Sequence, residues 1–306
     1  EECLKNLLNI KIDNFIGIQK VYIGFSKSNV YHNKKDYEHS TYYLKIANDE
    51  KLKIQPSDYS NKFKTGEFYR NLKLNRIYDS EDNNQYLFIV GMPRCGSTLL
   101  ESILSLNSDV KDLGEVLFLE ETLNEYGDIN QISQLYKDKI MVNKPLENIF
   151  TDKNLFNFLY CPIIFNLFPN AKIIHCLRNP LDNILSIYRT NFLNQSFSSS
   201  LIDIAELYIY HLKLMDEYKS KFGSLVYTYE HDKIIQNPRE NIYKLIKWLN
   251  WDWDEKYIYP NKNKRNVFTA SSAQVRQKIN SKSVGYWENY KDLLKPAIDL
   301  LSTYNL

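Results

Sequence analysis

The sequence predicts an α/β fold in which a parallel central sheet follows a small helical segment. Short apolar runs that suit buried strands alternate with helical periodicity from Tyr86 onward, and a glycine-bounded turn joins the first run to the first helix. Residues 1–80 show helical spacing and no strand pattern. With 43% hydrophobic and 25% charged residues, the 306-residue chain can bury a sizeable core.

Charge and composition exclude several classes of protein. A formal net charge of +2 is too small to favour nucleic acid as a partner. No run of about 18 apolar residues occurs, so we expect no membrane span. The four cysteines are scattered without metal-ligand spacing, which favours reduced thiols in a cytoplasm. The chain begins at Glu1 without Met, so a removed leader stays an open alternative.

The helical segment over residues 1–80 contains a repeat-like hairpin between Tyr22 and Asn48. Four of its residues have the spacing of the signature positions of one tetratricopeptide unit: Tyr31, Ser40, Leu44 and Ala47. The segment Asp36–Glu38 would open the second helix. Because a stack of such units needs roughly three repeats to stand alone, this one should lean on the next domain. A plain helical hairpin is the alternative.

A polar stretch over residues 79–84 is typical of a linker, so we place a second domain at 81–306. Ligands of parallel sheets bind at the carboxyl ends of strands, and the motifs below follow predicted strands. We expect strands at 86–90, 139–143, 171–177 and 225–229, and helices at 97–106, 155–167, 181–192 and 241–249.

The segment Gly91–Thr98 lies where a phosphate-binding loop would join a strand to its helix. Backbone amides and the helix N-terminus attract anions there. Its spacing matches the nucleotide-hydrolase loop, but Ser97 occupies the position of the required lysine. No predicted strand ends in an acidic residue that could hold Mg²⁺. A less charged sulfonate can be transferred with Arg, Lys and backbone donors alone. A tight strand-to-helix turn is the bland alternative.

A second anion site is predicted after the strand at 171–177. Asn179 can cap the next helix and Pro180 can begin it, which places Arg178 at the strand end. Ser186 and Arg189 are three residues apart and share a helical face. Two anion sites suit a ligand with phosphate at both ends.

These segments resemble the sulfotransferase superfamily, in its tyrosylprotein-sulfotransferase-like, tetratricopeptide-linked branch. The resemblance covers about Tyr86 to Tyr290 and implies a P-loop-type three-layer domain. The matching pieces, in order, are Pro93–Thr98, Gly114-Glu115, Asn143-Lys144-Pro145, Leu167–Lys172, the spacing of Arg178 and Ser186, Tyr227–Glu230 and Ser271–Val275.

The resemblance implies transfer of a sulfonate group from 3′-phosphoadenosine 5′-phosphosulfate to a hydroxyl acceptor, with adenosine 3′,5′-bisphosphate as product and no metal. The loop residues would hold the 5′-phosphosulfate: Arg94, Cys95, Gly96, Ser97 and Thr98. The 3′-phosphate would be held by Arg178 and Ser186, and the pocket completed by Tyr229 and Arg276. The implied catalytic residues are Glu115 as base, with Lys144, Ser271 and Arg94 stabilising the transition state.

Other interpretations stay open at this stage. Glu115 could be a helix-end carboxylate, Lys144 a solvated lysine and His175 a core histidine. A P-loop kinase or NTPase, and a catalytically dead binding module, are the competing functions. The acceptor could be a peptide tyrosine, a sugar hydroxyl, or a small alcohol or phenol. We expect a cytoplasmic protein of bacterial origin, as a monomer or a homodimer.

Overall fold

The computed structural model describes residues 2–72, 82–125, 129–142, 145–193, 195–263, 276–281 and 283–306. The chain divides into two compact units. The sheet unit comprises Lys62–Arg178 and His211–Ser281. The helical unit comprises Glu1–Asn61, Asn179–Tyr210 and Lys282–Leu306. The predicted boundary between residues 80 and 81 stays a prediction.

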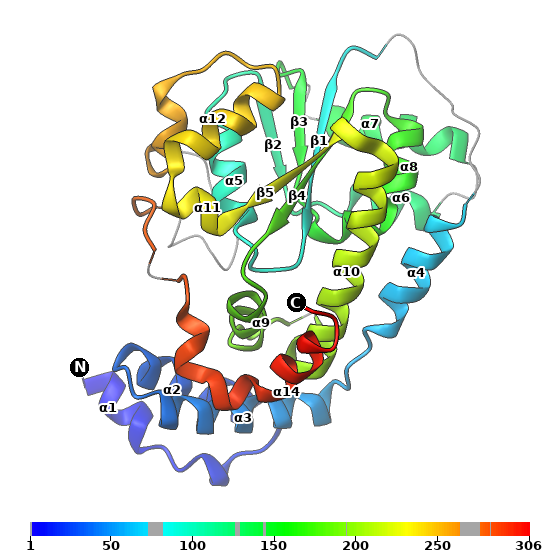
Figure 1. Ribbon diagram of the computed structural model, residues 1–306. Coiled ribbons are helices and arrows are strands. Elements are labelled where there is room, and N and C mark those ends of the chain that lie inside the picture. Colours follow the sequence, from blue (N-terminus) through cyan, green and yellow to red (C-terminus); the bar gives the residue numbers. More distant parts are fainter. Residues whose placement is uncertain are drawn as a thin grey trace. The chain divides into compact units, whose positions relative to one another are not determined.

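A parallel sheet forms the centre of the sheet unit (Figure 1). In the described ranges its strands are β1 (Gln85–Gly91), β2 (Val110–Gly114), β3 (Ile149–Asp152), β4 (Ala171–Leu177) and β5 (Val226–Glu230). Their order is β2-β3-β1-β4-β5, and every neighbouring pair is parallel. All carboxyl ends therefore meet at one edge. After β1 the chain passes to β2 on one side of the sheet, and after β4 it passes to β5 on the other side. The carboxyl edge therefore has a topological switch point between β1 and β4.

One face of the sheet is covered by α5 (Ser97–Leu104), α11 (His231–Gln236) and α12 (Pro238–Trp248) (Figure 1). Alternate residues of β1, Leu87 and Ile89, point into this layer because side chains of a strand alternate between faces. They pack with Leu100 and Ile103 of α5 in one buried cluster. The phosphate loop is thus anchored at both ends in a core.

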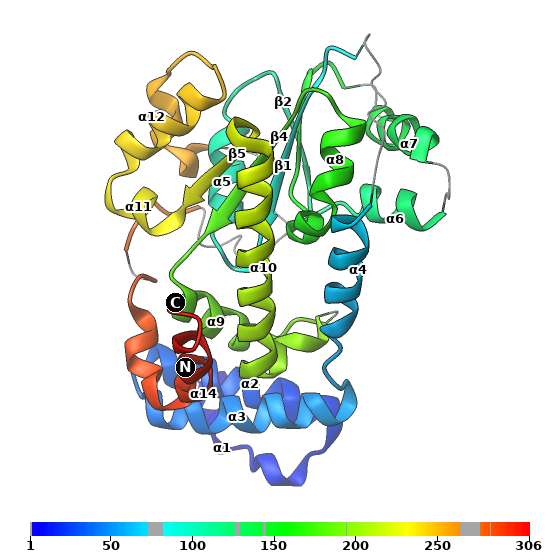
Figure 2. The ribbon, with the colours of Figure 1, turned by 45° about the vertical axis from the view of Figure 1, so that its right-hand side comes forward.

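The opposite face carries α6 (Phe118–Glu125), α7 (Ile129–Met141) and α8 (Cys161–Leu167) (Figures 1 and 2). Here the other residues of β1, Tyr86 and Phe88, pack on Tyr136 of α7 and Phe168. The rings of Tyr86 and Phe168 lie 4.9 Å apart between centroids. Helices on both faces give the three-layer α/β architecture that the sequence predicts.

Two further helices belong to the sheet unit in part, because the division between the two units falls within each of them. They are α4 (Ser60–Arg70) and α10 (Leu201–Phe222), and α10 enters the unit at His211. His211 lies against His175 of β4, with 2.7 Å between their Nε2 atoms, and its ring centroid is 4.9 Å from that of Phe158. His175 is therefore a core histidine, as the blander interpretation held.

The helical unit contains α1 (Glu2–Asn9), α2 (Gly17–Asn33), α3 (Tyr37–Ile54), α9 (Pro180–Tyr188) and α14 (Lys291–Ser302), with the first half of α10. The hairpin of α2 and α3 confirms the predicted helical pair. Asp36 caps α3 by accepting a hydrogen bond from the backbone N–H of His39. A Cβ on Gly24 would lie 2.8 Å from that of Ala47, so only glycine permits this close approach.

The predicted strand at 139–143 is wrong, because those residues continue α7 as far as Met141. Ile132, Tyr136 and Ile140 are spaced by four and are all buried, so a helical stripe outweighs the short apolar run. The strand nearest to the predicted one is β3, which begins at Ile149, ten residues after residue 139. Strand β2 lies at a segment for which no strand was predicted.

The remaining strand predictions are confirmed to within one residue at each end. The helix expected at 155–167 is a 3-10 segment, Leu155–Tyr160, followed by α8, and the helix expected at 181–192 ends at Tyr188. Of the predicted linker, residues 79–81 lie outside the described part of the chain. No helix among the described residues is both long and apolar enough to cross a bilayer.

Candidate active site

The loop between β1 and α5 has the backbone of an anion cradle. Arg94 has a φ of 67° and Gly96 a φ of 96°, so two left-handed residues turn the chain sharply into the helix. A Cβ on Gly96 would lie 2.2 Å from Nδ1 of His231. Glycine is therefore required both for the backbone angle and for the close imidazole.

The N-terminus of α5 lies at this loop. The first N–H groups of a helix have no intrahelical acceptors, and the helix dipole adds partial positive charge. Ser97 and Thr98 form the first turn, and each is about 5% exposed. The arrangement can bind a phosphate or sulfate through backbone donors without a lysine in the loop.

Arg178 brings a second cationic group to the same edge. It follows β4, the strand adjacent to β1, and its Nη1 donates to the carbonyl oxygen of Arg94 at 3.1 Å. The arginine thereby supports the strained loop residue and places positive charge at the switch point. Burial and then the charge of Arg178 lower the pKa of His231 to about 3, so this imidazole is neutral.

Cys95 lies beneath the loop in contact with Cys176 of β4. Both are 1% exposed and belong to the core cluster. Burial raises the pKa of Cys95, but hydrogen bonds from Cys176 and Ser97 outweigh burial and lower it below the usual value. Burial raises the pKa of Cys176 well above its usual value. The two thiols fill the floor of the loop.

A lysine follows β3 and a carboxylate follows β2, and a second carboxylate lies near them in α5. The backbone N–H of Lys153 donates to the carbonyl oxygen of Gly114 at 2.9 Å, which sets Lys153 beside Glu115. The Nζ of Lys153 is 2.9 Å from Oε1 of Glu115 and 3.5 Å from Oε2 of Glu101 in α5. The side chain of Glu115 is 54% exposed, and the other two are buried. A solvent-facing carboxylate thus lies over a buried ammonium.

Lys153 and Glu101 were missed by the sequence analysis. The cause is the misplaced strand at 139–143, which put the strand-end lysine at Lys144. The signal was present in Ile149–Lys153, where an apolar, β-branched run ends in two charged residues. Lys144 lies outside the described residues, so the role assigned to it stays a prediction.

Asp152 corrects the expectation that no strand ends in an acidic residue. Its Oδ1 accepts from the backbone N–H of Asn154 at 2.9 Å and from Nδ2 of Asn157 at 3.0 Å. Its Oδ2 accepts from the hydroxyl of Tyr136 at 2.9 Å. Burial raises the pKa of this carboxyl to about 7. The three hydrogen bonds engage both oxygens of Asp152 with neutral protein donors.

The other predicted site residues are placed differently. Tyr229 is fully buried in the core cluster with Cys95, and burial raises the pKa of its hydroxyl well above the usual value. Arg276 is exposed and donates from Nη1 to the carbonyl of Asn263 at 3.0 Å. Ser186 lies on α9 of the helical unit. Ser271 lies outside the described residues.

Arg189 is held by the helical unit. Its Nη1 lies 3.0 Å from Nε2 of His32, and its Nη2 donates to Oδ1 of Asn29 at 3.2 Å. The guanidinium carbon is 5.7 Å from the ring centroid of Tyr290. Asn179 caps α9 and Pro180 begins it, as predicted. These contacts give Arg189 a structural role in joining α9 to the hairpin.

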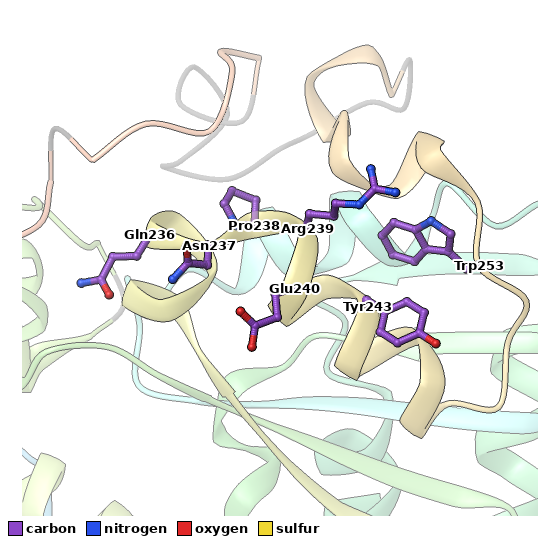
Figure 3. Close-up of a pocket in the computed structure, with 7 residues that line it drawn as sticks. All are labelled: Gln236, Asn237, Pro238, Arg239, Glu240, Tyr243 and Trp253. Carbon is purple, nitrogen blue, oxygen red and sulfur yellow. The ribbon is translucent and has the colours of Figure 1, made fainter.

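A surface hollow in the sheet unit lies around the start of α12 (Figure 3). In it Arg239 extends alongside Trp253, with 5.8 Å from the guanidinium carbon to the indole centroid, and forms an ion pair with Glu255. None of the predicted site residues lines this hollow. Its lining comprises Gln236, Asn237, Pro238, Arg239, Glu240, Tyr243 and Trp253.

Fold and loop together define an α/β protein with an anion cradle at the carboxyl edge of its sheet. The model of the Sulfotransferase family matches residues 86–135 and 127–255, which is more than half of the chain. The chain belongs to the sulfotransferase family.

The chain is also similar to individual proteins. An uncharacterized protein of Aquifex aeolicus is 30% identical over 242 residues, 70% of this chain and 32% of that protein. The chain thus spans about a third of that relative. A protein-tyrosine sulfotransferase of Drosophila melanogaster is 22% identical over 69% of this chain and 48% of that protein. The sulfotransferase domain of the Synechococcus PCC 7002 olefin synthase has a TM-score of 0.57 at 18% identity, covering 76% of this chain and 99% of that one.

Proposed function

We propose that the protein transfers a sulfonate group from 3′-phosphoadenosine 5′-phosphosulfate to a hydroxyl acceptor by in-line displacement. The observation that carries the proposal is the contact between Glu115 and Lys153 at the edge where a lysine-free phosphate loop begins. A base and an ammonium beside an anion cradle are the groups that transfer to a hydroxyl requires. The nucleotide supplies the activated sulfonate when bound.

Each residue has a distinct task in this proposal. Glu115 accepts the proton of the acceptor hydroxyl as its oxygen forms a bond to sulfur. Lys153 and Arg94 offset the negative charge that gathers on the bridging oxygen as its bond to sulfur breaks. Arg178 and the amides of α5 hold phosphate. The roles of Ser186, Tyr229, Arg276, Lys144 and Ser271 remain as the resemblance implies.

A metal-dependent phosphotransferase is less well supported by the side chains at the strand ends. The oxygens of Asp152 are occupied by Tyr136, Asn154 and Asn157, and the loop has Ser97 in place of lysine. Among the residues that the structure describes, no three His, Cys, Asp or Glu side chains are grouped as metal ligands. Relatives include a protein-tyrosine sulfotransferase, which makes a peptide tyrosine the first acceptor to test.

The test is transfer of labelled sulfonate from the nucleotide to tyrosine peptides, sugars, alcohols and phenols, with and without EDTA. We expect one acceptor class to be labelled and EDTA to leave the rate unchanged. Stabilisation by Mg²⁺ and ATP but not by adenosine 3′,5′-bisphosphate, with turnover that needs Mg²⁺, would favour the kinase alternative.

A further inference from the structure

Lys153 is held by two carboxylates whose surroundings differ. Its own side chain is 0% exposed, that of Glu101 is 1% exposed, and that of Glu115 is 54% exposed. Glu101 lies three residues after Thr98 on α5, on the core side of the ammonium. Glu115 covers the ammonium from the solvent side. One partner lies in the core and the other lies at the surface.

Electrostatics separates the two carboxylates further. A carboxylate stabilises a buried ammonium more than neutral contacts do, because neutral contacts offset the desolvation penalty only in part. A base that has taken up a proton is neutral and no longer serves as a counter-ion. If Glu115 accepts the acceptor's proton, Lys153 depends on Glu101 alone at that moment.

The other ionisable groups in this layer do not replace Glu101. Asp152 accepts only from Tyr136, Asn154 and Asn157 among the bonds described for it, and burial with the charge of Glu101 raises the pKa of its carboxyl. The buried thiol of Cys176 has a raised pKa and stays neutral.

We infer that Glu101 is a positioning residue: the permanent counter-ion that holds Lys153 in place while Glu115 leaves the ammonium to take the acceptor's proton. The inference rests on the proposed function. The proton moves from the acceptor oxygen to Glu115, the ammonium keeps its three protons, and Glu101 keeps its negative charge.

A double-mutant cycle tests the inference. Single-turnover transfer and affinity for adenosine 3′,5′-bisphosphate are measured for the wild type, Glu101→Gln, Lys153→Met and the double variant. We expect Glu101→Gln to slow transfer about tenfold or more with affinity unchanged, and the double variant to be no slower than Lys153→Met alone. Normal transfer by Glu101→Gln, or effects that multiply in the double variant, would overturn the inference.

Two controls keep the outcomes separable. Glu121→Gln removes the carboxylate of a partly exposed ion pair with Lys139, at 2.7 Å in the same unit, and should change neither quantity. If Glu101→Gln fails to fold, the double variant should regain the native melting transition, since no unpaired ammonium remains. A double variant that stays unfolded would show that Glu101 serves packing alone. A wild type that transfers nothing contradicts the proposed function instead.

Discussion

Buried lysines occur in both units, and their partners differ. In the sheet unit Lys153 contacts two carboxylates. In the helical unit Lys51 donates to the carbonyl oxygen of Phe192 and to Oγ of Ser198, and Lys27 donates to the carbonyl oxygens of Leu8 and Ile10. Within the described part of the chain, neither of these two forms an ion pair.

The difference fits the role that we propose for Lys153. Burial lowers the pKa of Lys51 to about 8 and lowers that of Lys27, because carbonyl oxygens offset desolvation only in part. Such lysines can satisfy loop and helix-end carbonyls even when their charge is partly lost. Lys153, for which we propose stabilisation of a leaving oxygen, contacts two carboxylates instead. Carboxylate partners thus distinguish Lys153 from Lys51 and Lys27.

The largest effect expected from this comparison separates Lys153 from Lys51. Lys153→Met should lower the single-turnover rate by about 10²–10³, the usual cost of losing one donor to transition-state charge. Lys51→Met should transfer sulfonate normally and unfold at lower temperature, since backbone carbonyls lose their donor. Equal rates for the two variants would break the comparison. Lys144→Ala in the same assay tells whether the lysine named by the resemblance contributes as well.

Two arginines of the sheet unit allow a similar contrast in nucleotide binding. Adenosine 3′,5′-bisphosphate should bind more tightly than adenosine 5′-monophosphate, and Arg178→Ala should remove a factor of roughly 10–100, the value of a charge-assisted hydrogen bond. Arg239→Ala, in the surface hollow, should keep the preference. Thermal shift and titration measure both. Equal affinity of the wild type for the two nucleotides would contradict the proposed 3′-phosphate site.

The paired histidines His175 and His211 are buried bases, and we expect them to make the fold acid-sensitive. Burial lowers the pKa of His211 to about 3 and that of His175 well below its usual value. The stability they contribute is present above the unfolded pKa of about 6.5 and is lost as the pH falls toward the folded value. Between pH 7 and 5.5, His211 should cost roughly 1.4 kcal/mol of unfolding free energy.

Denaturant unfolding at several pH values checks this prediction. His211→Phe should show a shallower loss below pH 6.5 than the wild type, although its stability at pH 7 should be lower because His175 loses its partner. Parallel pH profiles for the two proteins would show that other groups govern acid unfolding.

The smallest expected effect on stability is at Asp152, a buried carboxyl for which the structure describes no ion pair. Its folded pKa of about 7 lies above the unfolded value, so the stability it contributes is present below about pH 4 and lost as the pH rises through 7. Asp152→Asn should keep sulfonate transfer and gain stability relative to the wild type above pH 7. Loss of transfer, together with a requirement for Mg²⁺ in the wild type, would restore Asp152 as a metal ligand.

Much of the sheet could be predicted from the sequence, because parallel strands buried on both faces form continuous apolar runs. Such runs located β1, β4 and β5 to within a residue. The strand β3 has only four residues, and the nearby apolar end of α7 imitated it. A short run is ambiguous until tertiary packing decides which segment is a helix.

The site was predictable where residues follow a long strand or a distinctive loop. The loop residues Arg94 to Thr98 and Arg178 lie at strand ends as expected, and Glu115 follows β2, a strand that was not predicted. Lys153 was missed with its strand, and Glu101 could not be found because nothing in a helical pattern indicates which buried carboxylate faces an ammonium. Arg189, assigned to an anion site from spacing alone, lies instead against His32 and Asn29.

The most direct test of the account is a single-turnover assay of Glu115→Gln with the acceptor found by screening. Glutamine keeps the size and the hydrogen bond to Lys153 but cannot take a proton. We expect the rate to fall by about 10²–10⁴, with affinity for adenosine 3′,5′-bisphosphate unchanged. Near-normal turnover would contradict the account, because Glu115 would then be only a surface carboxylate above Lys153.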